Sequence, residues 1–197
     1  MRAALILCFC LLIAGCGPTL APAAAVSPAP SQGPASATRV EQPPVAPPTA
    51  PGTNLPAFAC ADASGGKTGV ANVFAARVAA QQGYDRFVLQ FDTLVPSYTV
   101  KRQSTPAFPL GASGQTITLS GTSGALVRVH SATGASTYTG PTDFTHNEYP
   151  VLKEARQTED FEGYVSWGLG LGKAACMRTF TLADPPRLVV DFSTATS

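Results

Sequence analysis

Neither sign of charge prevails in this sequence. Its 197 residues include 13 Lys and Arg and 12 Asp and Glu, so the formal net charge is only +1. A protein that binds nucleic acid uses a surplus of basic residues to neutralise phosphates. The missing surplus therefore argues against nucleic acid as a partner.

Histidine is also scarce, which argues against most catalytic and metal-binding sites that depend on histidine. His130 and His146 are the only two; neither has an obvious partner, and both are expected at the surface. The stretch "YVSWGLG" (164–170) resembles the strand that follows the nucleophile in trypsin-like proteases. The serine motif of that family does not precede it, which argues against a Ser-His-Asp triad. We therefore expect no catalytic residue, no metal ligand and no cofactor.

Two further motifs have simple structural explanations. "ADASGGKT" (61–68) loosely fits a nucleotide-binding P-loop, but Pro56 and Cys60 precede it where a buried strand is needed. A flexible glycine loop is the better interpretation. Asp160 and Glu162 are a carboxylate pair of the kind that binds calcium or acts in acid–base chemistry. Two acids at i and i+2 share one face of a strand, so we expect a solvated hairpin edge.

No apolar run is long enough to cross a membrane. The run at residues 3–13 counts eleven residues, whereas a membrane-spanning helix needs about 20. Arg2 before it and small residues after it are typical of a secretory signal peptide. The closing "IAGC" (13–16) resembles the bacterial lipobox, which implies a signal peptide over residues 1–15 and a lipid on Cys16. A secreted chain cleaved nearby and a retained anchor are the alternatives.

The lipobox also implies a location. Two or more acyl chains on one cysteine hold a protein stably on a bilayer. We expect an exported protein, anchored through Cys16 on the outer side of a bacterial cell membrane, or on an outer membrane.

Few cysteines remain once the signal peptide is removed. Cys8 and Cys10 leave with it and Cys16 carries the lipid, so Cys60 and Cys176 remain as one pair. Disulfides persist in the oxidising compartment to which the chain is exported. We predict a Cys60–Cys176 disulfide. A metal site would need the two histidines as well, because structural zinc takes four ligands.

Residues 17–57 lack the side chains of a core. Eleven of these 41 residues are Pro and ten are Ala, and only Arg39 and Glu41 carry charge. Such a composition favours disorder with polyproline character. Together with Cys16 the segment forms a tether over residues 16–57 that holds the following domain away from the membrane.

Residues 58–197 are predicted to form a single antiparallel β-sandwich of the all-β class. Apolar residues alternate with polar ones over short stretches that Gly- and Pro-bearing turns separate. In "GVANVFAARVAAQQG" (69–83) the pattern fits either helix or strand; we favour a strand that pairs with "GYDRFVLQFD" (83–92). The predicted one-face sets are Phe87, Leu89 and Phe91; Phe161, Val165, Trp167 and Leu169; Phe180 and Leu182; and Leu188, Val190 and Phe192.

Three stretches in order resemble the AMIN-like domain of bacterial, chiefly actinobacterial, lipoproteins. They are "GYDRFVLQFD" (83–92), "DFEGYVSWGLGL" (160–171) and "FTLADPPRLVVDF" (180–192). The last also resembles the closing hairpin of the wider AMIN domain, a small β-sandwich that accompanies cell-wall amidases and secretins. Within these motifs we expect Asp85 and Arg86 at a salt-bridged strand edge, with Asp191 facing away from the core.

The resemblance implies a non-catalytic cell-envelope module that binds peptidoglycan or a wall-associated protein. A lipoprotein that carries a small or lipidic ligand is one alternative, and an enzyme is another. The binding residues are not apparent from the sequence. The segments 101–115 and 131–150 are the expected recognition loops, because loops on a rigid scaffold usually carry function.

Overall fold

The computed structural model describes residues 54–135 and 137–195. The predicted signal peptide, Cys16 and the tether up to residue 53 lie outside these residues. Thirteen strands and one short 3-10 helix, η1 (Gly111–Ser113), follow one another in the described part. The strands are β1 (Ala63–Gly65), β2 (Ala71–Gln81), β3 (Tyr84–Phe91), β4 (Tyr98–Gln103), β5 (Ala107–Pro109), β6 (Thr116–Thr118), β7 (Ser123–His130), β8 (Ala132–Thr133), β9 (Asp143–Thr145), β10 (Leu152–Phe161), β11 (Tyr164–Leu171), β12 (Met177–Ala183) and β13 (Pro186–Ser193).

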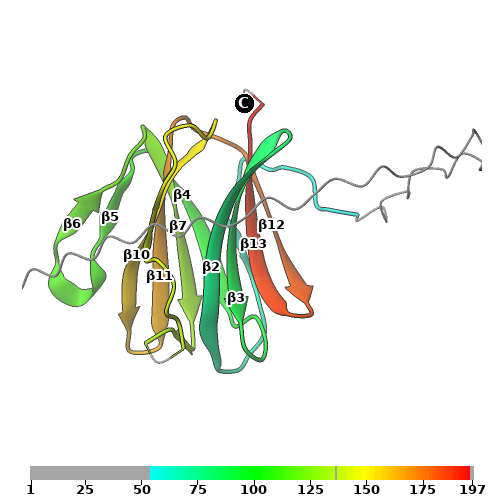
Figure 1. Ribbon diagram of the computed structural model, residues 1–197, viewed down its shortest axis with the longest axis vertical. Coiled ribbons are helices and arrows are strands. Elements are labelled where there is room, and N and C mark those ends of the chain that lie inside the picture. The colour runs from blue at the N-terminus through cyan, green and yellow to red at the C-terminus, as the bar shows by residue number, and fades with distance from the viewer. Residues whose placement is uncertain (1–53, 136, 196–197) are drawn as a thin grey trace, which may run out of the picture. The chain divides into compact units, whose positions relative to one another are not determined.

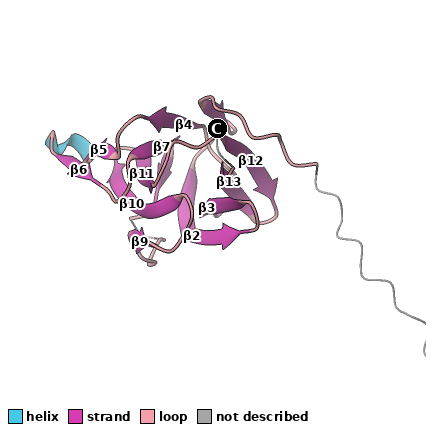
Figure 2. Cartoon of the chain, turned by 90° about the horizontal axis from the view of Figure 1, so that it is seen from above, coloured by secondary structure: helices cyan, strands magenta, loops and turns pink. Residues whose placement is uncertain are grey.

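Two sheets face each other and confirm the predicted sandwich (Figure 1). The six-stranded sheet has the order β1-β4-β7-β11-β10-β9, and the five-stranded sheet has the order β12-β13-β3-β2-β8. All pairs are antiparallel except the short β2–β8 pair. A separate β5–β6 hairpin with η1 at its tip projects to one side as an arm (Figure 2).

The core lies between the sheets and is built by the predicted alternation. Phe87, Leu89 and Phe91 are fully buried on β3, as are Leu188, Val190 and Phe192 on β13. Trp167 of β11 packs against Phe87, with ring centroids 5.4 Å apart. Each such side chain contributes about 1.5–3 kcal/mol by leaving water. The expected core position of Phe180 and Leu182 is wrong. They pair with Val189 and Arg187 and so lie half-buried on the outer face of the five-stranded sheet, opposite Leu188, Val190 and Phe192.

The ambiguous segment is a strand, as predicted. Residues 71–81 form β2 and pair with β3 from Gln81↔Tyr84 to Val73↔Phe91. A register shift between Val73 and Ala75 marks a bulge. A bulge adds one residue to the strand and re-aims side chains, and here Phe74 is 58% exposed.

The expected single strand across residues 161–169 is wrong. Phe161 ends β10, Tyr164 begins β11, and Glu162 and Gly163 form the two-residue turn between them. Both turn residues have positive φ, 48° and 79°, which is the geometry of a tight hairpin turn. Val165, Trp167 and Leu169 are buried as expected, but Phe161 is 56% exposed.

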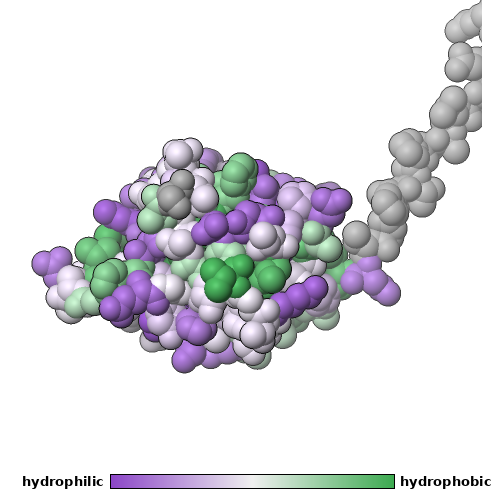
Figure 3. All heavy atoms as spheres, turned by 90° about the horizontal axis from the view of Figure 1, so that it is seen from below, coloured by the Kyte–Doolittle hydropathy of each residue, from purple (hydrophilic) through white to green (hydrophobic). Residues whose placement is uncertain are grey.

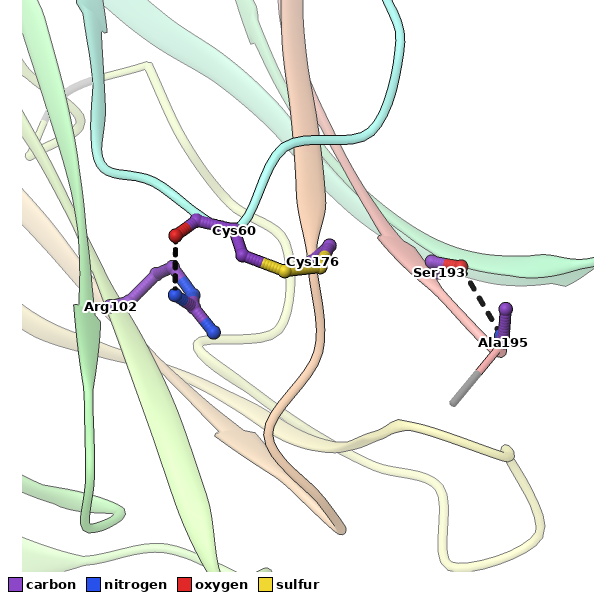
Figure 4. Close-up of a disulfide and its surroundings, with 5 residues drawn as sticks. All are labelled: Cys60, Arg102, Cys176, Ser193 and Ala195. Carbon is purple, nitrogen blue, oxygen red and sulfur yellow. Dashed lines mark hydrogen bonds between the residues drawn. A yellow bond between two sulfur atoms is a disulfide. The ribbon is translucent and has the colours of Figure 1, made fainter. Parts of the chain in front are cut away.

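The predicted disulfide is present. Cys60 and Cys176 are joined, with 116 residues of sequence separation (Figure 4). An antiparallel bridge between Ala59 and Met177 lies beside it. The bond fastens the first described residues to the start of β12.

Asp85 holds the two sheets together at one end of the sandwich. Its carboxylate is fully buried and accepts hydrogen bonds from the backbone N–H groups of Val151 and Leu152, at 2.6 and 2.8 Å. The expected salt-bridged edge at Asp85 and Arg86 therefore needs correction. Alternation places the two side chains on opposite faces of β3, and Arg86 pairs with Asp191 instead.

Glycines in β7 and β11 make room for the arm. A Cβ at Gly168 would lie 2.7 Å from the Phe108 ring, and one at Gly170 would lie 2.3 Å from the carbonyl oxygen of Ser120. Phe108 is fully buried there. The glycines of "WGLGL" therefore let the arm pack on the outer face of the six-stranded sheet.

Gly170→Ala should destabilise the protein by about 1–3 kcal/mol, because the new methyl group meets backbone that must move. Urea unfolding measures the loss, and hydrogen exchange of the arm amides should accelerate. Gly172→Ala is the matched control, since its Cβ meets only the flexible end of Lys153 at 2.8 Å. Equal losses in both variants would contradict this role of Gly170.

Candidate functional site

Three rings form a row on the outer face of the six-stranded sheet. Phe161 of β10 pairs in register with Tyr164 of β11, which pairs with His130 of β7. Directly paired residues lie on the same face of a sheet. The Tyr164 and His130 ring centroids are 4.7 Å apart. Strand spacing is 4.7–4.9 Å, so three strands place these rings within a row of about 10 Å.

A polar row lies two residues further along the same strands. Glu159 pairs with Ser166, Ser166 with Arg128, and Arg128 with Thr99 of β4. The Ser166 hydroxyl donates to Glu159 Oε2 at 2.8 Å, and Arg128 Nη2 lies 3.5 Å from the same oxygen. We call the two rows together the ring platform: Phe161, Tyr164, His130, Arg128 and Glu159.

Arg128 connects the two rows. Its guanidinium carbon lies 4.1 Å from the Tyr164 ring centroid, within cation–π range. Its side chain is 46% exposed, whereas that of Glu159 is 17% exposed. Arg128 therefore has donors available to a ligand while its position is fixed by an aromatic ring and a carboxylate.

Two shallow hollows meet at Arg128. One has a volume of about 210 Å³ and lies beside the rings; it is lined by Ser97, Tyr98, Thr99, Arg128, His130 and Tyr164. The other, of about 220 Å³, lies toward the arm and is lined by Pro109, Gly111, Leu126, Arg128, Thr158, Glu159 and Ser166. One hollow therefore lies beside the aromatic rings, and the other lies beside the polar side chains of Glu159 and Ser166.

The platform lies at the end of the sandwich where β7 and β10 finish (Figure 1). Val70, just before β2, is 75% exposed at the same end. Figure 3 views the molecule from that end and shows apolar atoms in the middle of the surface, surrounded by polar ones.

Tyr98 differs from the platform residues, although it lines one hollow. It faces the core, and burial raises the pKa of its phenol. The phenol therefore remains neutral and serves as the floor of the hollow rather than as an acid or base.

The structure separates the two carboxylates that the sequence brings together. Asp160 accepts hydrogen bonds from the Thr133 hydroxyl and the Gly134 N–H, both at 2.9 Å, while Glu162 lies in the turn. The expected shared strand face is therefore wrong. Within residues 54–135 and 137–195, no group of three His, Cys, Asp or Glu side chains is placed to hold a metal ion.

Both histidines have partners, contrary to expectation. His130 contacts Tyr164 in the ring row. His146 Nδ1 lies 2.8 Å from Glu148 Oε1, and its ring stacks on Tyr149 at 4.3 Å. The hydrogen bond from His146 lowers the pKa of Glu148.

The glycine stretch and the two expected recognition loops carry regular structure. Within "ADASGGKT", residues 63–65 form β1 and pair with β4 rather than a flexible loop. The segment 101–115 includes β5 and buried Phe108. In 131–150, Tyr138 and Phe144 pack on Trp167 at centroid distances of 6.2 and 6.0 Å.

No helix in the described part of the chain is long and apolar enough to span a membrane. The comparison with curated proteins found no match. The family model of the AMIN-like domain matches residues 71–194, which includes most of the described strands. The chain belongs to the AMIN-like domain family.

Proposed function

We propose that this protein is a non-catalytic cell-envelope module that binds wall glycan, with peptidoglycan as the first candidate, through the ring platform. The predicted lipid on Cys16 holds it at the membrane. Membership of the AMIN-like family supports a role at the cell wall. The observation that carries the proposed surface is the row Phe161, Tyr164 and His130 on one exposed sheet face.

The chemistry of the platform suits sugars. Ring faces accept the apolar C–H side of a sugar, and aromatic side chains offer this area with little loss of side-chain freedom. Arg128 and Glu159 supply a donor and an acceptor for hydroxyls, and charge-assisted hydrogen bonds of this kind are the stronger ones. The row length of about 10 Å, two strand spacings, is comparable with a disaccharide.

The position of the platform also suits a tethered protein. The predicted tether reaches the domain near Cys60, which is bonded to Cys176 at the start of β12. Because the strands are antiparallel, β12 starts at the same end as β7. The rings lie at the opposite end of the sandwich and are free to meet the wall.

A carrier of lipidic ligands would need an apolar cavity between the sheets. In the described domain, Phe87, Phe91 and Trp167 are fully buried in this space. Side chains thus occupy the place that such a ligand needs, which favours surface binding.

Tyr164→Ala should weaken binding to peptidoglycan sacculi at least tenfold, because it removes a central ring of the row and the cation–π partner that positions Arg128, and loss of a central aromatic contact typically costs about 2 kcal/mol or more. Co-sedimentation of residues 17–197, without the lipid, measures the affinity. Phe74→Ala is the control, since Phe74 is 58% exposed, close to the 56% of Phe161 in the ring row, but lies on the five-stranded sheet.

Saturable pelleting that soluble wall fragments compete away, and that Tyr164→Ala alone weakens, is the expected result. If the unmodified protein did not pellet with sacculi, the glycan proposal would be wrong, and the partner would be sought among wall-associated proteins. Equal weakening by Phe74→Ala would place the binding surface elsewhere.

A further inference from the structure

A larger cavity, separate from the two hollows of the ring platform, lies at the opposite end of the sandwich. It has a volume of about 510 Å³, within the range of small-molecule sites. None of the platform residues lines it. The lining residues are Arg102, Gln103, Ser104, Thr122, Ser123, Gly124, Leu171, Ala174 and Ala175.

One buried hydroxyl at this cavity has no hydrogen-bond partner. Ser123 is only 6% exposed and its Oγ is unpaired. Ser123 begins β7 on the side of Ala125 and Val127, so its hydroxyl faces the space between the sheets. Buried hydroxyls are nearly always paired, so an unpaired one at a cavity wall indicates a site for a polar ligand.

Arg102 is the only charged side chain among the lining residues. Its Nη1 donates to the carbonyl oxygen of Cys60 at 2.8 Å (Figure 4). Its backbone N–H donates to Asp62 Oδ1 at 2.9 Å. Arg102 pairs with Ala125 across the sheet, so its side chain leaves the strand on the same side as Ser123. The disulfide segment thus holds a guanidinium at the cavity.

The remaining wall is apolar and small. Leu171 and Ala175 are buried, and Ala174 is exposed beside them. A ligand that fills the cavity therefore meets one cation, one unpaired hydroxyl and a surface sized for a small alkyl group.

We propose that this cavity binds the free carboxylate end of a short peptide with small side chains. The carboxylate lies against Arg102 and accepts from the Ser123 hydroxyl, an arrangement typical of guanidinium–carboxylate recognition. A methyl side chain contacts Leu171, Ala174 and Ala175. This site is independent of the proposed glycan surface.

The test is an NMR titration of disulfide-bonded residues 17–197 with N-acetyl-alanyl-alanine and with its C-terminal amide. The acid should shift the amide signals of residues 102–104 and 122–124, and the amide should bind at least tenfold more weakly. Arg102→Gln should weaken binding of the acid to a similar extent. Equal affinity for acid and amide, or no binding of either, would overturn the proposal.

Ser123→Ala separates a ligand-binding role from a structural one. Removing a buried, unpaired hydroxyl relieves its desolvation cost, so the melting temperature should rise by about 2–4 °C while affinity for the acid falls severalfold. A lower melting temperature with unchanged affinity would show that the hydroxyl supports the fold and would refute its role in binding. Tyr164→Ala should leave binding of the acid unchanged, so failure at one site is distinguishable from failure at the other.

Discussion

Removal of the Cys60–Cys176 disulfide should lower the free energy of unfolding by about 5 kcal/mol. The bond closes a loop with a sequence separation of 116 residues, and the chain-entropy model gives about 4.7 kcal/mol for a loop of 100 residues. Strands β1 to β11 all lie inside this loop. The open chain therefore gains conformational freedom mainly in its unfolded state.

Urea unfolding of the double variant Cys60→Ser/Cys176→Ser measures this effect. With a slope of about 2 kcal/mol per molar urea, the midpoint should fall by about 2.5 M. Reductant should destabilise the unchanged protein to the same degree and leave the double variant unaffected. If both proteins had the same midpoint before reduction, the disulfide would contribute nothing to stability.

The bond should also matter locally. The carbonyl oxygen of Cys60 accepts a hydrogen bond from Arg102, so the disulfide fixes the acceptor that positions this guanidinium. Loss of the bond frees the residues around Cys60 and should increase hydrogen exchange at the start of β1 and the end of β4 before the core strands are affected.

Alternation predicted most of the core correctly. Period-two patterns placed Phe87, Leu89 and Phe91 on one buried face, and did the same for Leu188, Val190 and Phe192. The pattern is reliable here because a shift of one residue turns every side chain to the other face. Counting cysteines predicted the disulfide, since a single pair remained for the exported domain.

The ring platform could not be predicted, because it depends on register between strands. Phe161, Tyr164 and His130 come from three strands, and only pairing shows that they form one row. A local signal did exist. Glu162 and Gly163 form the two-residue turn, and the correct hairpin would have placed Phe161 beside Tyr164. Alternation read through that turn assigned Phe161 to the core instead.

The outer face of the five-stranded sheet contains a buried ion-pair cluster that the sequence predicted only in part. Asp191 faces away from Leu188, Val190 and Phe192 as expected, and it is fully buried. Its carboxylate accepts two hydrogen bonds from Arg86, from Nε at 2.6 Å and from Nη2 at 2.9 Å. It accepts a third from Nε of Arg178, at 2.7 Å. The hydrogen bond with Asp191 raises the pKa of Arg86, so that guanidinium remains charged.

Aromatic rings exclude water from this cluster. The Arg178 guanidinium lies 4.5 Å from the Phe58 ring centroid and 4.7 Å from that of Tyr84. Arg86 lies 5.1 Å from Tyr84 and 5.5 Å from Phe180. Arg86 and Arg178 therefore each stack on aromatic rings, and each donates hydrogen bonds to the Asp191 carboxylate.

Asp191→Ala should destabilise the protein by about 3–5 kcal/mol, the usual cost of removing one partner from a buried ion pair. Two stacked guanidiniums would lose their common acceptor. Asp143→Ala is the matched control, because Asp143 and Arg156 are 3.5 Å apart and both side chains are more than 40% exposed. That variant should lose less than about 1 kcal/mol.

The decisive variant removes the positive charges of both arginines together with the negative charge of Asp191. The triple variant Arg86→Met/Arg178→Met/Asp191→Leu leaves no unpaired charge, so it should recover most of the stability that Asp191→Ala loses, since buried ion clusters are often replaced by apolar residues at no net cost. Urea unfolding of the single, control and triple variants measures this directly. A triple variant less stable than Asp191→Ala would show that the arginines act chiefly through their stacking on Phe58, Tyr84 and Phe180. In that case the carboxylate would orient the guanidiniums over the rings, and the cation–π contacts would supply the stability that the ion pair is expected to supply.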